Sequence, residues 1–74
     1  MKLYQVRALI AASTYTVIHH RIATDEWSRV TPDYKHWDES LKIAFDLMNF
    51  WRDATVMHIA VNSITGLIEI TCEE

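Results

Sequence analysis

Apolar residues recur with a helical period between Thr31 and Asp53, and they occupy more of the helix surface than one small sheet can cover. At about 100° per residue, they span an arc of roughly 220°, whereas a surface helix usually shows a little over 100°. The pattern predicts one long helix over residues 31–53, with Thr31 as N-cap and Pro32 in the first turn. Its central stripe consists of Trp37, Leu41, Ala44, Phe45, Met48 and Trp51, and its flank consists of Ile43, Leu47 and Phe50.

Alternating apolar and polar residues predict strands on both sides of this helix. The predicted strands cover residues 3–10, 14–23, 56–61 and 67–72. The first is ambiguous, because Leu3 and Val6 also fit one face of a helix. Residues 11–13 are expected to join the first two strands in a hairpin, and residues 24–30 to form a loop. The single glycine, Gly66, predicts a second hairpin between the last two strands.

The order strand, strand, helix, strand, strand predicts an α+β fold, in which one long helix packs on one face of an antiparallel four-stranded sheet. The chain has 74 residues, of which 50% are hydrophobic, with one glycine and one proline. This composition is typical of a single small globular domain over residues 1–74, without low-complexity segments.

Charge and cysteine content narrow the class of protein. The net charge is −3, and the seven Lys and Arg residues are scattered along the chain, which argues against direct nucleic-acid binding. A single cysteine, Cys72, excludes an internal disulfide framework and fits a reducing compartment. No apolar run approaches the roughly 20 residues of a membrane span, and no targeting signal is recognised after Met1. A cytoplasmic protein with no membrane partner is expected.

The histidines are the main candidates for metal ligands and catalytic residues. Adjacent residues of a strand point to opposite faces, so His19 and His20 are not expected to hold one ion, and no Cys-x-x-Cys or His-x-x-x-His pair occurs. No metal site and no cofactor are predicted. His58 is expected to lie opposite Glu69, where the two could form a base with an orienting carboxylate or an ordinary cross-strand pair. Because no nucleophile motif or phosphate-binding loop accompanies this pair, the prediction is a protein without catalytic activity.

The surplus apolar flank of the predicted helix suggests a surface that contacts another protein. Tryptophan is enriched at binding hot spots, and Trp27 lies in a polar segment where it either folds over the helix or meets a partner. The polar side of the helix is a possible acidic docking stripe, although a solvated face has the same composition. The predicted protein-binding residues are Trp27, Ile43, Asp46, Leu47, Phe50 and Asp53.

Elimination therefore favours a small non-enzymatic protein-binding module that acts by surface attachment, with a homodimer expected. Phages and mobile elements encode such proteins as inhibitors of host bacterial complexes, and we expect this type of protein. One alternative is a small enzyme or ligand-binding subunit whose pocket forms around His20 and His36 at a dimer interface. A further alternative is an acidic mimic of nucleic acid, for which a net charge of −3 is small.

Overall fold

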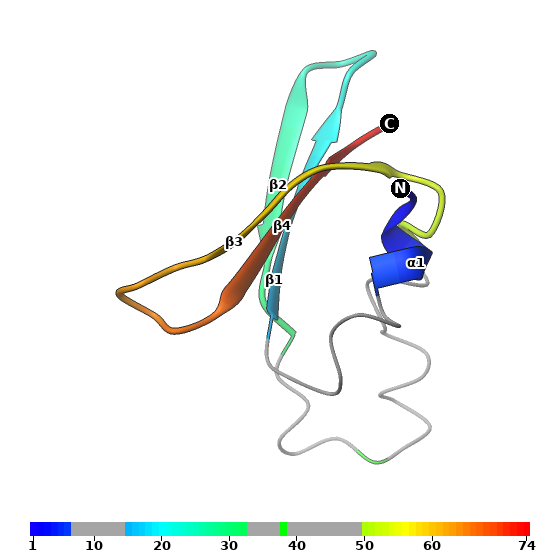
Figure 1. The fold of residues 1–74 in the computed structure, drawn as a ribbon. Coiled ribbons are helices and arrows are strands. Elements are labelled where there is room, and N and C mark those ends of the chain that lie inside the picture. The colour runs from blue at the N-terminus through cyan, green and yellow to red at the C-terminus, as the bar shows by residue number, and fades with distance from the viewer. Residues whose placement is uncertain (7–14, 33–37, 39–49) are drawn as a thin grey trace.

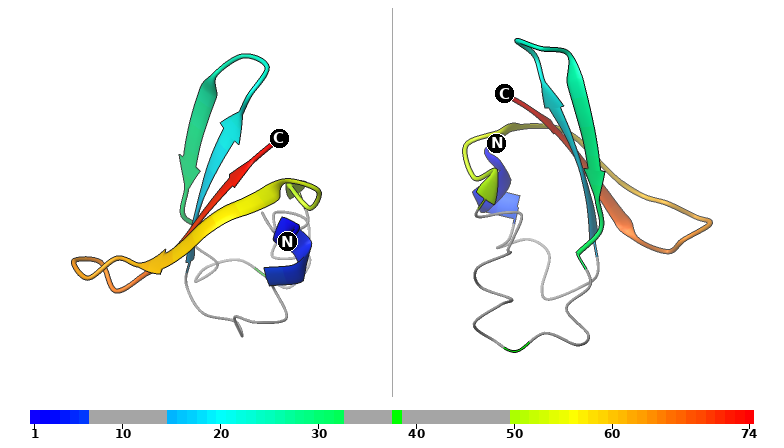
Figure 2. Two further views of the ribbon diagram at one scale, coloured as in Figure 1. Left: turned by 45° about the horizontal axis from the view of Figure 1, so that its top comes forward. Right: turned by 180° about the vertical axis from the view of Figure 1, so that it is seen from behind.

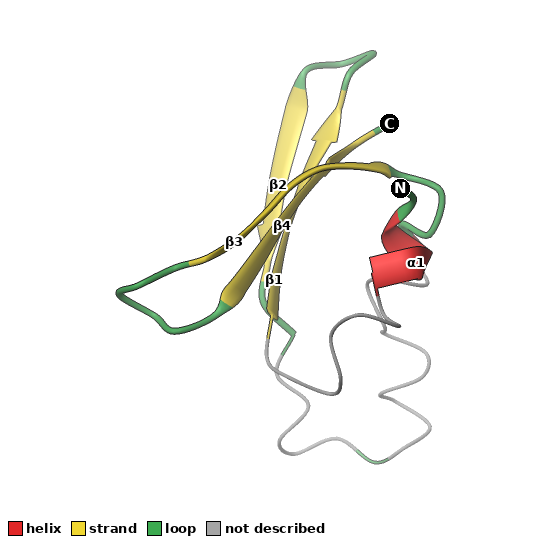
Figure 3. Ribbon diagram, in the orientation of Figure 1, coloured by secondary structure: helices red, strands yellow, loops and turns green. Residues whose placement is uncertain are grey.

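Two β-hairpins form the frame of this protein (Figure 1). The computed structural model describes residues 1–6, 15–32, 38 and 50–74. The described elements are α1 (Leu3–Val6), β1 (Tyr15–Arg21), β2 (Glu26–Val30), β3 (Thr55–Val61) and β4 (Ile68–Glu73). They form a four-stranded sheet in the order β2-β1-β4-β3. The two hairpins therefore meet through their central strands, β1 and β4 (Figure 3).

The prediction of an antiparallel sheet is wrong, because β1 and β4 run parallel. Their register places Tyr15 opposite Ile68 and Val17 opposite Ile70, whereas each hairpin is antiparallel. A parallel pair cannot be closed by a tight turn and needs a long crossover connection. Residues 31–54 connect the two hairpins. The alternation of side chains has the same period in parallel and antiparallel strands, so the sequence pattern did not reveal this pairing.

The prediction of a long helix packed on the sheet is also wrong for the part of the chain that the structure describes. There, α1 is the one named α-helix, and it has four residues. Residues 33–37 and 39–49 lie outside the described residues, and residues 51–53 form a turn.

The first predicted strand begins instead with the short helix α1. Leu3 and Val6 are three residues apart, so one helical face carries both, and both are fully buried. In a strand they would point to opposite faces. Because a helix buries Leu3 and Val6 against the same core, this segment forms a helix and not a strand.

Strand β2 occupies a segment predicted to be a loop. Its five residues are all exposed, since β2 lies at the edge of the sheet and pairs with β1 alone among the described strands. Without a buried face, the segment shows no alternation of apolar and polar residues. Its pairing partner, β1, determines its conformation, with Val30 opposite Val17 and Glu26 opposite Arg21.

The core lies between α1 and one face of the sheet, which Figure 2 shows from two further sides. Its fully or nearly fully buried members are Leu3, Val6, Tyr15, Val17, Ala54, Ile70 and Cys72, and Trp51, Val56 and Ile68 pack against them. Backbone hydrogen bonds attach the N-terminal segment: the Leu3 N–H donates to the Ala54 carbonyl (2.9 Å), and the Val56 N–H donates to the Met1 carbonyl (2.8 Å). Among the described residues, no helix is long and apolar enough to cross a membrane.

Candidate functional site

The sheet presents a second face, directed away from the core, which we call the outer face. Residues that lie opposite one another in the register share a face, so the strand pairings define its members. They are Thr16, Ile18 and His20 on β1, Trp27 and Arg29 on β2, His58 and Ala60 on β3, and Glu69, Thr71 and Glu73 on β4. Aromatic, cationic and acidic side chains therefore lie together on a surface built from both hairpins.

Trp27 is the most prominent apolar side chain of the outer face. It is 60% exposed, yet its ring stacks on the imidazole of His20, its register partner, with ring centroids 4.1 Å apart and planes at 9°. His20 Nε2 donates to the Asp25 carboxylate over 2.7 Å. Trp27 is thus held flat against a neighbour that is itself fixed, while much of its surface remains open to solvent.

The turn between β1 and β2 places Asp25 for this contact. Its backbone lies in the left-handed region, with φ of 53°, a conformation that Asp adopts more readily than most residues with a Cβ atom. The Asp25 N–H donates to the carbonyl of Ile22 (3.3 Å). The turn therefore both reverses the chain and orients the carboxylate towards His20.

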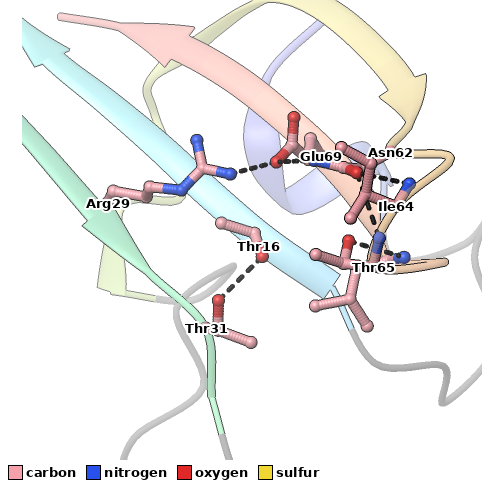
Figure 4. A network of polar contacts seen from close by, with 8 residues as sticks. Thr16, Arg29, Thr31, Asn62, Ile64, Thr65 and Glu69 are labelled. Atoms are coloured by element: carbon pink, nitrogen blue, oxygen red, sulfur yellow. Dashed lines mark hydrogen bonds and ion pairs between the residues drawn. The ribbon is translucent and has the colours of Figure 1, made fainter.

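Polar contacts lie within and between the two hairpins on the outer face, and the Arg29–Glu69 ion pair joins one hairpin to the other (Figure 4). Arg29 on β2 donates to the Glu69 carboxylate on β4, and Asn62 Nδ2 donates to the same carboxylate over 3.3 Å. The hydroxyl groups of Thr16 and Thr31 are hydrogen-bonded over 2.8 Å. An exposed ion pair of this kind contributes about 0–1 kcal/mol. The main effect of the Arg29–Glu69 ion pair is structural: it gives the Glu69 carboxylate a partner and holds the Arg29 side chain over β1.

The expected pair of His58 and Glu69 does not form. The register that runs from the turn places Ala60 opposite Glu69 and His58 opposite Thr71, two residues from the expected partner, and a bulge follows between His58 and Val56. Glu69 instead accepts hydrogen bonds from Arg29 and Asn62. The base with an orienting carboxylate that the sequence suggested is therefore absent at this position.

The prediction that His19 and His20 point to opposite faces is confirmed. His19 lies on the core side, 3% exposed, where it is hydrogen-bonded to Glu74 (2.7 Å) and stacked on Trp51 (centroids 4.4 Å apart, planes at 10°). Within residues 1–6, 15–32, 38 and 50–74, no group of three or more His, Cys, Asp or Glu residues could hold a metal ion. His36, a member of the alternative pocket, lies outside the described residues.

Cys72 is a buried structural residue. It is fully buried and faces the core, and burial together with the nearby negative charge of Glu74 raises its pKa from 9.0 to about 11. The thiolate is the nucleophilic form of cysteine. At neutral pH Cys72 therefore stays protonated and unreactive.

The predicted binding residues that the structure describes are Trp27, Phe50 and Asp53, and they lie at different places on the molecule. Trp27 lies on the outer face, whereas Phe50 (72% exposed) packs edge-on against Trp51, whose ring lies on His19 on the core side. Asp53 is exposed in the turn before β3. The remaining three, Ile43, Asp46 and Leu47, lie outside the described residues.

One exposed apolar surface was missed by the sequence analysis. Met57, Ile59 and Val61 are all exposed on β3, and Ile64 in the following turn is 94% exposed. A sequence signal does exist: no Lys, Arg, Asp or Glu occurs between Thr55 and Ile68. An uncharged strand at the end of a sheet leaves apolar side chains unprotected.

Comparison with protein families, with curated proteins and with solved structures finds no match to this chain.

Proposed function

We propose that this chain is a non-enzymatic protein-binding module that attaches to another protein through Trp27 and the adjoining outer face. The observation that carries this proposal is the combination of exposure and fixed position at Trp27: 60% of it is accessible while it stacks on His20. Binding costs free energy for every side chain that must be ordered. A tryptophan that is already fixed contributes a large apolar ring at little further entropic cost.

The surroundings of Trp27 have the composition of a protein interface. Arg29 lies two residues after Trp27 on β2, and its side chain is more than half exposed. Trp and Arg are both enriched at binding hot spots. Ile18, which lies opposite Arg29 on the neighbouring strand, adds apolar surface that is half-buried. An aromatic anchor surrounded by polar and charged groups is the usual arrangement of a partner-binding patch.

Three titratable groups, His19, His20 and Cys72, fit binding better than catalysis. His20 donates a hydrogen bond from its Nε2–H to Asp25, and its ring stacks on Trp27, so we assign it the role of positioning the tryptophan. His19 is buried against Trp51, and the raised pKa of Cys72 keeps its thiol protonated.

The test is affinity capture with a tagged chain from a lysate of the cell that produces it. Trp27→Ala is compared with the wild-type chain and with Phe50→Ala, which removes an aromatic ring of similar exposure on the other side of the sheet. A hot-spot residue contributes about 2 kcal/mol or more, so we expect at least a roughly 30-fold loss of the partner with Trp27→Ala and retention with Phe50→Ala. Circular dichroism verifies that both variants fold. If no captured protein depends on Trp27, the proposal is wrong.

A further inference from the structure

Strand β3 has one edge that the described part of the sheet leaves largely open. In the order β2-β1-β4-β3 it is an end strand and pairs with β4 on one side. Three of its side chains, Met57, Ile59 and Val61, are exposed apolar groups. The hairpin that it forms with β4 projects away from α1 and from the β1–β2 hairpin (Figure 1).

The two ends of the sheet differ in charge. Strand β2 carries Glu26 and Arg29, and charges on an edge strand are a common protection against pairing with another chain. Strand β3 and the turn after it carry no charged residue from Thr55 to Ile68. An uncharged edge can approach a copy of itself without placing like charges opposite one another.

Backbone geometry shows which groups of β3 are directed outwards. The start of its outer edge already accepts an antiparallel partner, since Lys2 bridges Thr55. At the other end, the Asn62 N–H donates inwards to the Leu67 carbonyl (2.9 Å). Backbone groups alternate in direction along an antiparallel strand, so those of Val61 and Ile59 point away from β4.

We infer that β3 pairs with β3 of a second copy of this chain, antiparallel, with the two-fold axis at Ala60. Ile59 of one copy then lies opposite Val61 of the other, and their outward backbone groups form reciprocal hydrogen bonds. Ala60 occupies the axis, where a small side chain permits close approach. The bulge between Val56 and His58 distorts β3 on the N-terminal side of Ala60. This distortion favours a pairing centred on Ala60 over a pairing centred nearer Met57.

Electrostatic repulsion does not prevent this pairing. Each chain carries a net charge of −3, but the charged residue that faces Ala60 on β4 is Glu69, which is paired with Arg29. The Glu69 residues of the two copies are separated by three strand spacings, about 14 Å, which exceeds the Debye length of about 8 Å at physiological salt. Because each copy uses the same edge, the contact closes as a dimer and does not extend into a fibre.

The test measures self-association and backbone protection together. Sedimentation velocity from about 10 μM to about 1 mM covers the weak affinity expected of a small interface. Val61→Lys adds a charge to the pairing edge, and Ile22→Lys, at an exposed isoleucine in the β1–β2 turn, is the matched control. We expect the wild type and Ile22→Lys to dimerise and Val61→Lys to remain monomeric. Amide exchange at Ile59 and Val61 should slow with concentration, while exchange at Asn62 should not.

A wild-type chain that stays monomeric at about 1 mM overturns the inference. So does a dimer that tolerates Val61→Lys, or one in which the Ile59 and Val61 amides gain no protection. The contact is independent of the proposed function, because Trp27 lies on the opposite edge strand. Trp27→Ala should therefore lose its captured partner and still dimerise, so failure of one proposal leaves the other intact.

Discussion

Replacing Leu3 by alanine tests whether the N-terminal segment is a core helix. Leu3 is fully buried and, with Ile70, is one of the largest fully buried side chains among the described residues. Its truncation removes transfer free energy and leaves a cavity, at a cost of about 2–5 kcal/mol. A domain of this length has a free energy of unfolding of about 4–11 kcal/mol. The single substitution therefore removes a large share of the total stability.

The assay is urea unfolding of the wild type, Leu3→Ala and Val6→Ala, followed by circular dichroism. We expect a loss of about 3 kcal/mol for Leu3→Ala with an unchanged m-value, and a comparable loss for Val6→Ala. The control is Ile64→Ala, which truncates a 94% exposed side chain and should change stability by no more than about 0.5 kcal/mol. A helix requires both core substitutions to be costly, whereas a strand would make only one of them costly. A loss below about 1 kcal/mol for Leu3→Ala would refute the placement of α1 in the core.

Two further substitutions test the core and the turn. The unfolded thiol of Cys72 loses its proton near pH 9 and the folded one near pH 11, so its contribution is complete below pH 9 and falls by about 2–3 kcal/mol as the pH rises to 11. With Cys72→Val, the free energy of unfolding should fall less steeply between pH 9 and pH 11. If the pH dependence is unchanged by this substitution, the raised pKa of the Cys72 thiol is contradicted. Asp25→Ala keeps a Cβ atom at φ 53° but removes the carboxylate that accepts the hydrogen bond from His20, which should cost about 1–2 kcal/mol in thermal unfolding. Asp25→Gly relieves the backbone strain and should cost less; equal losses would show that backbone strain is unimportant.

Three of the four described strands were predictable because they are rich in β-branched residues and alternate in polarity along the chain. In β4, Ile70 and Cys72 are fully buried, and the same period of two correctly predicts that His19 and His20 lie on opposite faces. The β3–β4 hairpin was recognisable from Gly66, which adopts φ 72°. Strand alternation and a turn glycine are determined by residues close together in the sequence, so the sequence alone predicts them.

The features that escaped prediction depend on neighbours distant in sequence. β2 has no buried side and so no pattern, and nothing local distinguishes the parallel pairing of β1 with β4. The bulge before His58 is not marked by a glycine, and the register set from the turn places Ala60, not His58, opposite Glu69. Stacking of His20 on Trp27, the basis of the candidate site, follows from β2 being a strand, which the sequence had placed in a loop.

The binding role of Trp27 is tested most directly by fluorine NMR of the chain labelled with 5-fluorotryptophan, with and without the captured partner. The three tryptophans, Trp27, Trp37 and Trp51, give separate resonances that Trp→Phe variants assign. We expect the Trp27 resonance to shift or broaden on saturation, while that of Trp51, partly buried against the core, stays in place. A Trp27 resonance that is unchanged when the partner is bound would contradict the proposed function.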